Sequence, residues 1–267
     1  MTTRILHLNK DAAAPAGLPT NERFRLIPAG GIRLDADHVT IASGRVNEFV
    51  NVINGQLYGA NSNQDYAVVD NVNGVNVATF DKTLVVAPTG YTMGTAFGFG
   101  GLNTGQYTFA ALWKVTDGFL PAKQREYIAQ ASLGTTSNRA ALREDASGAM
   151  QARALRATGG TVTIVSIFSP VRIDGWCAAA GVFDWTNNLL TIHDLLGTES
   201  VSAAILGTSG AAPGDISAYR LGYFVNTEDS WFNGHLADYF HLPYAPTRGE
   251  LLPLKMHMQA RAADLAG

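Results

Sequence analysis

The chain has 267 residues, of which 15% are charged, and its formal net charge at neutral pH is −3. A slightly acidic chain has no basic footprint for nucleic acid, so nucleic-acid binding is not expected. No apolar run approaches the roughly 20 residues that a membrane-spanning helix needs, so membrane insertion is not expected either. The charged fraction is below the roughly 25% of an ordinary soluble domain. Together with 28 glycines and scattered Asn-Gly pairs, it favours many strands joined by tight turns.

The single cysteine, Cys177, excludes an intrachain disulfide. It follows Trp176 in an apolar run, so we expect it to be a small buried hydrophobe and not a nucleophile. The first residues contain no apolar core of a secretory signal. The chain also has no Asn-x-Ser/Thr sequon. We therefore expect synthesis and folding in a cytoplasm, with a final place that can be extracellular.

The first part of the chain differs in texture from the rest. Residues 1–38 carry three prolines and the Gly30-Gly31 pair with little periodicity, which is typical of an arm or linker. From Val39 onward, short β-rich runs recur. We therefore expect an N-terminal arm over 1–38 and one domain over 39–267.

Alternating apolar residues predict most of the strands. Two Asn-Gly pairs, Asn54-Gly55 and Asn73-Gly74, lie between apolar runs and indicate hairpins, because both residue types tolerate positive φ. Residues 107–113 place aromatic and small apolar side chains on one face, as a half-buried strand does. The other strands expected before the tryptophan segment are 39–41, 66–69, 75–80, 83–86, 127–131, 140–144, 150–155 and 161–168.

One helix is expected, at the C-terminal end. Thr247 and Glu250 have the spacing of a capping box. The apolar stripe that follows is Leu251, Leu254, Met258 and Ala262. Pro253 comes early enough in the helix to be tolerated.

The order of these segments resembles the concanavalin A-like lectin/glucanase superfamily, and within it the laminin-G-like jelly-roll domains of phage and bacterial surface proteins. The resemblance covers about residues 40–262. Its matching segments are 77–81, 107–113, 140–144 with Gly148, 175–184, 187–192, 219–222, 232–238 and the closing helix at 247–262. The resemblance implies an all-β fold: a two-sheet antiparallel jelly-roll sandwich with an N-terminal arm and a short C-terminal helix.

Glycan hydrolysis is not expected. The glucanases of this superfamily carry carboxylates two residues apart on one strand, which places them on one face. Here Glu144-Asp145 and Glu228-Asp229 are adjacent, so on a strand they face opposite sides. We therefore expect no catalytic residues and no enzymatic activity.

Metal binding is not expected either, with calcium left open. The calcium loop of legume-type lectins contains closely spaced Asp and Asn residues. This chain has a similar group of residues whose spacing does not match that loop: Asn226, Glu228, Asp229 and Asn233. His235 and His241 are about 20 Å apart along a strand, too far to share one ion.

The last strand offers the first set of candidate binding residues. Strict alternation predicts that Phe232, Leu236, Phe240 and Leu242 point to the core. The opposite, outer face would then carry Trp231, Asn233, His235, Tyr239 and His241. Such a row suits a sugar-stacking platform or a subunit interface. It is also compatible with aromatic residues left at the rim of the sandwich, or with cover by the terminal helix.

The loop before that strand is the second candidate. It runs from Tyr223 to Trp231 and includes Asn226, Glu228 and Asp229. Loops at the ends of sandwiches commonly carry binding residues, although an ordinary hairpin tip has the same composition.

The function predicted first is a non-enzymatic virion or appendage structural protein, such as a phage fibre, spike or decoration protein. Its jelly roll would bind host-surface glycan or neighbouring subunits, as a homo-oligomer or as part of a larger assembly. The alternative is a free carbohydrate-binding lectin module. A divergent glycoside hydrolase is the third reading.

Overall fold

The computed structural model describes a β-sandwich closed by one C-terminal helix. It describes residues 31–59, 67–80, 91–94, 105–116, 126–133, 137–156, 160–207, 218–222 and 232–267. This confirms the all-β sandwich with a C-terminal helix. In that part of the chain, no helix is long and apolar enough to cross a membrane.

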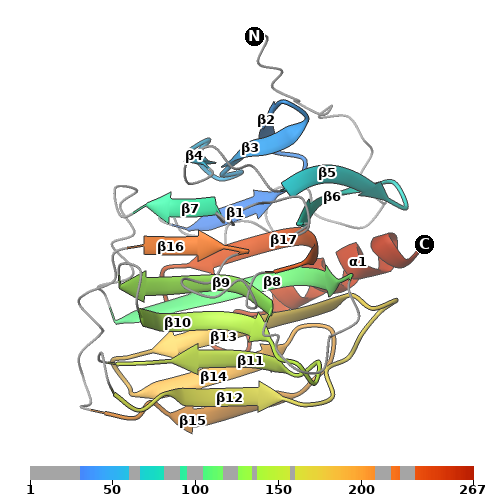
Figure 1. Ribbon diagram of the computed structural model, residues 1–267. Helices are drawn as coiled ribbons and strands as arrows, with labels where there is room; N and C mark the ends of the chain where they lie inside the picture. Colours follow the sequence, from blue (N-terminus) through green and yellow to red (C-terminus); the bar gives the residue numbers. More distant parts are fainter. Residues whose placement is uncertain are drawn as a thin grey trace.

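The described strands form two large antiparallel sheets and one small one. The larger sheet has the order β15 (Ser200–Ala204), β14 (Leu189–Asp194), β13 (Cys177–Asp184), β8 (Gln106–Val115), β17 (Gly234–Leu242), β6 (Val75–Phe80) and β5 (Ala67–Val72), and β1 (Ile32–Asp35) also pairs with β17. The smaller sheet has the order β12 (Thr163–Ile167), β11 (Met150–Ala154), β10 (Ser137–Glu144), β9 (Glu126–Leu133), β16 (Ala218–Leu221) and β7 (Tyr91–Gly94). A three-stranded sheet of β2 (Val39–Ala42), β3 (Arg45–Val50) and β4 (Leu57–Gly59) lies near β1 and β7 (Figure 1).

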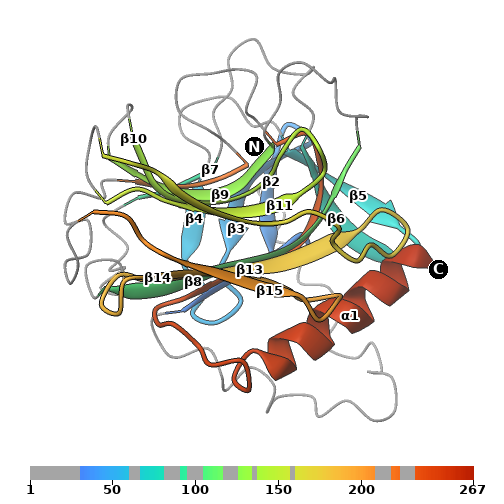
Figure 2. The same cartoon turned by 90° about the horizontal axis from the view of Figure 1, so that it is seen from below.

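Two apolar cores hold these layers together. The first lies between the two large sheets and includes Trp113, Phe183 and Trp185. The second lies between the larger sheet and α1 (Leu252–Ala266), and includes Trp176 and Met258. Figure 2 shows α1 against the side of the larger sheet that faces away from the smaller sheet. Because both of its faces are packed, the larger sheet has apolar residues at consecutive positions, as in β13, which is buried throughout.

Several local predictions are confirmed. Asn73 and Gly74 both have positive φ, at 50° and 84°, in the turn between β5 and β6. Cys177 is fully buried, and burial raises the pKa of its thiol. The Thr83–Val86 strand lies outside the described residues. β1 falls inside the range expected to be the arm, but it pairs with β17 through residues 238–241.

The terminal helix begins later than its capping box. Thr247 and Glu250 exchange the two expected hydrogen bonds, with the Thr247 amide donating to Glu250 over 2.7 Å. They close a turn before the helix, which starts at Leu252. Leu251, Met258 and Ala262 are buried, which confirms the predicted apolar stripe.

A β-bulge in β17 sets the direction of every later side chain in that strand. Leu236 pairs with Trp113 of β8, and Asp238 pairs with the next residue, Leu112. Ala237 is therefore an extra residue, which leaves it and Asp238 on the same face. That face is the one that α1 covers.

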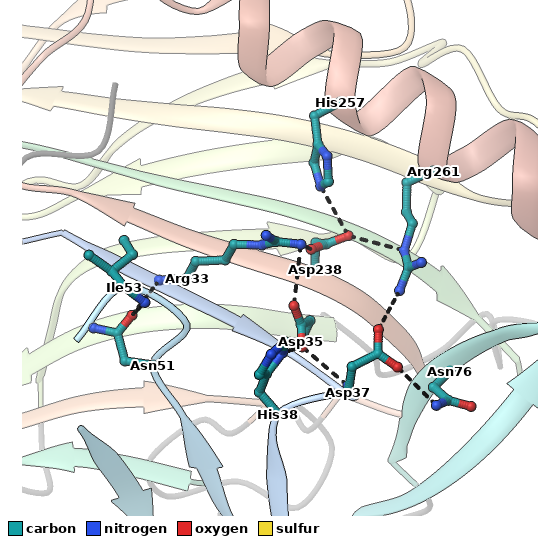
Figure 3. A network of polar contacts seen from close by, with 10 residues as sticks. All are labelled: Arg33, Asp35, Asp37, His38, Asn51, Ile53, Asn76, Asp238, His257 and Arg261. Atoms are coloured by element: carbon teal, nitrogen blue, oxygen red, sulfur yellow. Dashed lines mark hydrogen bonds and ion pairs between the residues drawn. The ribbon is translucent and has the colours of Figure 1, made fainter. Parts of the chain in front are cut away.

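The Asp238 carboxylate consequently lies under the helix, fully buried, as the centre of a polar network (Figure 3). Arg33 of β1 lies 3.4 Å from its Oδ1. His257 and Arg261 of α1 lie 3.3 and 3.5 Å from its Oδ2. Burial favours the neutral acid, but the positive charges of His257, Arg33 and Arg261 outweigh it and hold the pKa of Asp238 well below its usual range. The Asp238 carboxylate therefore connects β1 and α1 to β17 through ion pairs.

We expect Asp238→Asn to lower the free energy of unfolding at neutral pH by about 3 kcal/mol, because the partly buried Arg33 and Arg261 each lose one of the two carboxylates beside them. Urea denaturation measures this. The matched control is Asp174→Asn, which removes an exposed ion pair to Lys114 and should cost less than about 1 kcal/mol. Equal losses in the two variants would contradict this role for Asp238.

The same carboxylate should contribute to acid sensitivity. Its pKa is lower in the folded state, so its stabilisation is complete above the ordinary value of 3.8 and is lost as the pH falls below it. The difference in stability between wild type and Asp238→Asn should therefore shrink between pH 5 and about pH 2. A difference that stays constant over this range would argue against the assignment.

Candidate functional site

The structure describes some of the binding residues predicted from the sequence and not others. Tyr223, Asn226, Glu228, Asp229 and Trp231 lie outside the described residues, so the loop and any calcium there remain predictions. The remaining four candidates, Asn233, His235, Tyr239 and His241, are described.

Two of these four lie at the start of β17. Asn233 is 3% exposed, and its carbonyl oxygen accepts a hydrogen bond from the Thr116 amide. His235 is half-buried on the outer side of the larger sheet. Its Nδ1 lies 2.7 Å from the hydroxyl of Thr79, and its ring lies 6.0 Å from that of Trp176. The outward prediction is therefore correct for His235 alone of the four, and Asn233 is buried instead.

The other two were placed on the wrong face. Tyr239 and His241 are fully buried between the sheets, and the His241 ring lies 6.0 Å from Tyr107 and 5.6 Å from Phe109. Phe240, expected in that core, instead packs under α1. The bulge at Ala237 is the physical reason, because strict alternation fails after an extra residue. An aromatic platform over the whole of this strand is therefore excluded.

Burial lowers the pKa of His241 to about 3, well below the ordinary 6.5. The unfolded chain therefore takes up a proton on this residue below about pH 6.5 that the folded chain does not. We expect wild type to lose about 2–3 kcal/mol through this residue between pH 7 and pH 4.5, and His241→Leu to escape that loss. Chemical denaturation across this pH range measures the difference.

His38 provides a contrast of opposite sign. A hydrogen bond to Asp35 raises the pKa of His38, so its contribution is present below the unfolded pKa and is lost as the pH rises. His38→Gln should therefore lose more stability at pH 5 than at pH 8.

A His241→Leu variant with the pH dependence of wild type would mean that His241 is solvated.

The carboxylates that the sequence singled out form a structural cluster. Glu144 is 2% exposed; its Oε2 accepts from the Trp113 indole over 2.8 Å, and its Oε1 accepts from Arg172 over 2.7 Å. The thiol of Cys177 lies 3.4 Å from the same carboxylate. Asp145 caps the following turn through the amides of Ser147 and Ala149. Both oxygens of Glu144 are thus engaged in the interior.

The outer side of the smaller sheet carries a polar surface that sequence reasoning missed. Its inward residues, such as Leu142 of β10 and Ala152 of β11, belong to the core between the sheets. Alternate residues on these strands therefore point outward. We call this outward-pointing set of side chains the arginine face, and define it by Arg143, Arg153, Arg220, Gln130 and Gln151, of which Arg153 is partly exposed and the other four are buried.

Strand register brings these side chains side by side. Arg220 of β16 pairs with Gln130 of β9, Gln130 pairs with Ala141 of β10, and Ala141 pairs with Arg153 of β11. The row crosses three strand spacings, about 14 Å. Its short member, Ala141, stands between two long polar side chains. Beside it, Arg143 pairs with Gln151 in the next row and donates to its Oε1 over 2.8 and 2.6 Å.

Gln130 is the unusual member of the row. It is fully buried, and neither its amide nitrogen nor its amide oxygen makes a hydrogen bond in the described part of the chain. A buried amide without hydrogen-bond partners lowers the stability of the folded protein by about 1–3 kcal/mol. The packing of the fold therefore does not explain why a glutamine stands at position 130. By contrast, Gln151 is satisfied, since its Nε2 also donates to Asp145 over 2.6 Å.

The arginine face suits recognition of hydroxyl and carboxylate groups. Guanidinium groups offer several donors in a fixed fork that matches a carboxylate, and glutamine offers both donors and an acceptor. Across the described ranges, no three His, Cys, Asp or Glu side chains gather as a metal site would require. The sequence shows an arginine next to apolar residues in each of the segments 140–144 and 150–154. It does not show the strand register that aligns these arginines with β9 and β16.

We expect Gln130→Leu to leave the free energy of unfolding unchanged or to raise it by about 1 kcal/mol, because it removes two buried polar atoms without partners. Gln151→Leu is the matched control. It should lower the free energy of unfolding by about 1–3 kcal/mol, because it removes the acceptor of Arg143 and the amide donor to Asp145. Thermal unfolding of both variants tests the difference. A large loss in Gln130→Leu would show that the amide serves the fold.

Comparison with known proteins identifies the architecture. No family model and no curated protein sequence matches the chain. Among solved structures, the chain is similar to Trypanosoma rangeli sialidase in complex with the inhibitor DANA, with a TM-score of 0.55, 13% identity, and coverage of 84% of this chain and 32% of the sialidase. It is also similar to the binding domain of botulinum neurotoxin serotype D/C, with a TM-score of 0.55, 7% identity, and coverage of 85% and 52%.

A shorter match is the CBM40 module of Ruminococcus gnavus IT-sialidase, with a TM-score of 0.49, 12% identity, and coverage of 62% of this chain and 92% of the module. Identities this low show the fold and not the ligand. The chain therefore has a β-sandwich fold, as the resemblance in the sequence implied.

Proposed function

We propose that this protein is a non-enzymatic carbohydrate-binding module that holds its glycan on the arginine face. The observation that carries the proposal is the buried amide of Gln130, which has no hydrogen-bond partner in the described chain, in a row between Arg220 and Arg153. A glycan hydroxyl or carboxylate group would satisfy it once the binding of the glycan had uncovered the amide, which is fully buried. The similarity of the fold to a botulinum neurotoxin binding domain supports a binding role by analogy.

The geometry of the row supports an extended ligand. Three strand spacings separate Arg220 from Arg153, so a ligand that contacts both arginines is an oligosaccharide and not a single ring. Ala141 leaves room between them because its side chain is one methyl group. Arginine at the two ends favours glycans with carboxylate or other acidic groups.

The non-enzymatic part of the proposal is supported by the carboxylates. Glu144 points into the core, where Trp113 and Arg172 occupy its oxygens, and Asp145 caps a turn. Neither is available as the acid and nucleophile pair of a glycosidase. The virion or appendage role expected from the sequence is a finer proposal, which the oligomeric state of the purified protein would test.

A glycan array that contains neutral and acidic oligosaccharides tests the proposal. We expect saturable binding, confirmed by titration calorimetry, that Arg153→Gln weakens at least about tenfold, as loss of a charge-assisted hydrogen bond does. The matched control is Arg45→Gln, the same change on β3, which should bind as wild type does.

Two results would contradict the proposal. One is the absence of any glycan bound above background. The other is full binding by a folded Arg153→Gln, Gln130→Leu double variant. Release of reducing ends from a bound glycan would overturn the non-enzymatic part alone.

A further inference from the structure

A pocket of about 400 Å³ lies between the β14–β15 turn and the beginning of α1. Its size is within the range of small-molecule sites. It lies on the helix side of the larger sheet, whereas the arginine face is on the outer side of the smaller sheet. It is therefore independent of the proposed glycan site. We call it the hairpin–helix pocket, and its wall includes His193, Leu195, Glu199, Arg248, Leu252 and Lys255.

One part of the wall is apolar. Leu195 and Leu251 are nearly fully buried, so they form a fixed surface. Leu252 also lines the pocket, and its side chain is 54% exposed. Covering an exposed leucine with an apolar group gains free energy in proportion to the area removed from water.

Asp194 lines the pocket but is already satisfied. Its Oδ1 accepts from the amides of Leu196 and Gly197 over 2.9 and 2.8 Å, and its Oδ2 accepts from the amide of Val171 over 2.9 Å. These three donors compensate its charge where it stands, at the base of the turn. Asp194 therefore shapes the pocket and is not a group that would pair with a ligand.

The cations of the pocket are less fully engaged. The Lys255 ammonium donates to the carbonyl oxygen of Gly197, which leaves two of its three donors. Arg248 is exposed and makes no ion pair or hydrogen bond with any residue in the described ranges. Glu199 is exposed and likewise unpaired within them. The wall therefore carries two cations, Arg248 and Lys255, and two carboxylates, of which Asp194 is held by backbone amides and Glu199 is solvated.

His193 adds a polar group that has no hydrogen-bond partner among the described residues. It is half-buried on β14. Burial, together with the nearby positive charge of Arg248, lowers its pKa. His193 and Arg248 both line the pocket.

We propose that the hairpin–helix pocket binds a small organic anion, with a carboxylate between Arg248 and Lys255 and an apolar body on Leu251 and Leu252. His193 supplies a further hydrogen-bonding group to the carboxylate. Such a ligand uses both kinds of lining residue, the cations Arg248 and Lys255 and the leucines Leu251 and Leu252. Binding is non-covalent.

Titration of ¹⁵N-labelled protein with sodium benzoate, followed by NMR, tests the pocket. We expect saturable shifts confined to residues 193–200 and 248–255, and no comparable shifts with benzamide, which has the same ring without the charge. Arg248→Gln should weaken benzoate about tenfold. Glu199→Gln should tighten it a few-fold, because it removes the opposing charge.

Arg45→Gln is the control for a general loss of positive charge and should bind benzoate as wild type does. The proposal fails if benzoate causes no saturable shift, or if benzamide binds equally well. It also fails if Arg248→Gln, whose exposed side chain is not needed for folding, keeps the wild-type affinity. None of these results bears on glycan binding at the arginine face.

Discussion

The buried carboxylate of Asp238 is the interaction on which the arrangement of layers depends. A charge without solvent is tolerated only when other charges surround it, so Asp238 requires Arg33 from one end of the described chain and His257 and Arg261 from the other. The helix cannot leave the larger sheet without removing His257 and Arg261 from the buried Asp238 carboxylate, which would then keep only Arg33. The bulge at Ala237 creates this situation by turning Asp238 toward α1. The same bulge turns Tyr239 and His241 into the core.

That bulge also marks the limit of what the sequence predicts. Apolar runs located β8 and β10 and the resemblance located β13, because the apolar character of each residue is a local signal, and the Asn-Gly turns identified hairpins because tolerance of positive φ is a property of the residues themselves. An extra residue in β17 has no such local signal. It depends on pairing with β8 and on the cations of a helix later in the chain, so the sequence assigned Tyr239, Phe240 and His241 to the wrong faces.

The arginine face was missed for a related reason. Arg153 and Arg220 are far apart in the chain, and they share a row only because β11, β10, β9 and β16 pair in a fixed register. Composition could not show this, since each arginine alone is typical of a solvated strand position. The two outer sides of the sandwich consequently differ. The larger sheet uses its outer side to dock α1, while the smaller sheet keeps polar side chains there that the core does not require.

In the function proposed for this protein, a glycan binds at the arginine face and not at β17. A crystal structure of the protein with its tightest glycan from the array tests this most directly. We expect a sugar oxygen within hydrogen-bonding distance of the Gln130 amide, and a guanidinium group of Arg153 or Arg220 on the same ligand. A glycan bound instead beside His235, or on α1, with Gln130 still without a partner, would contradict the claim.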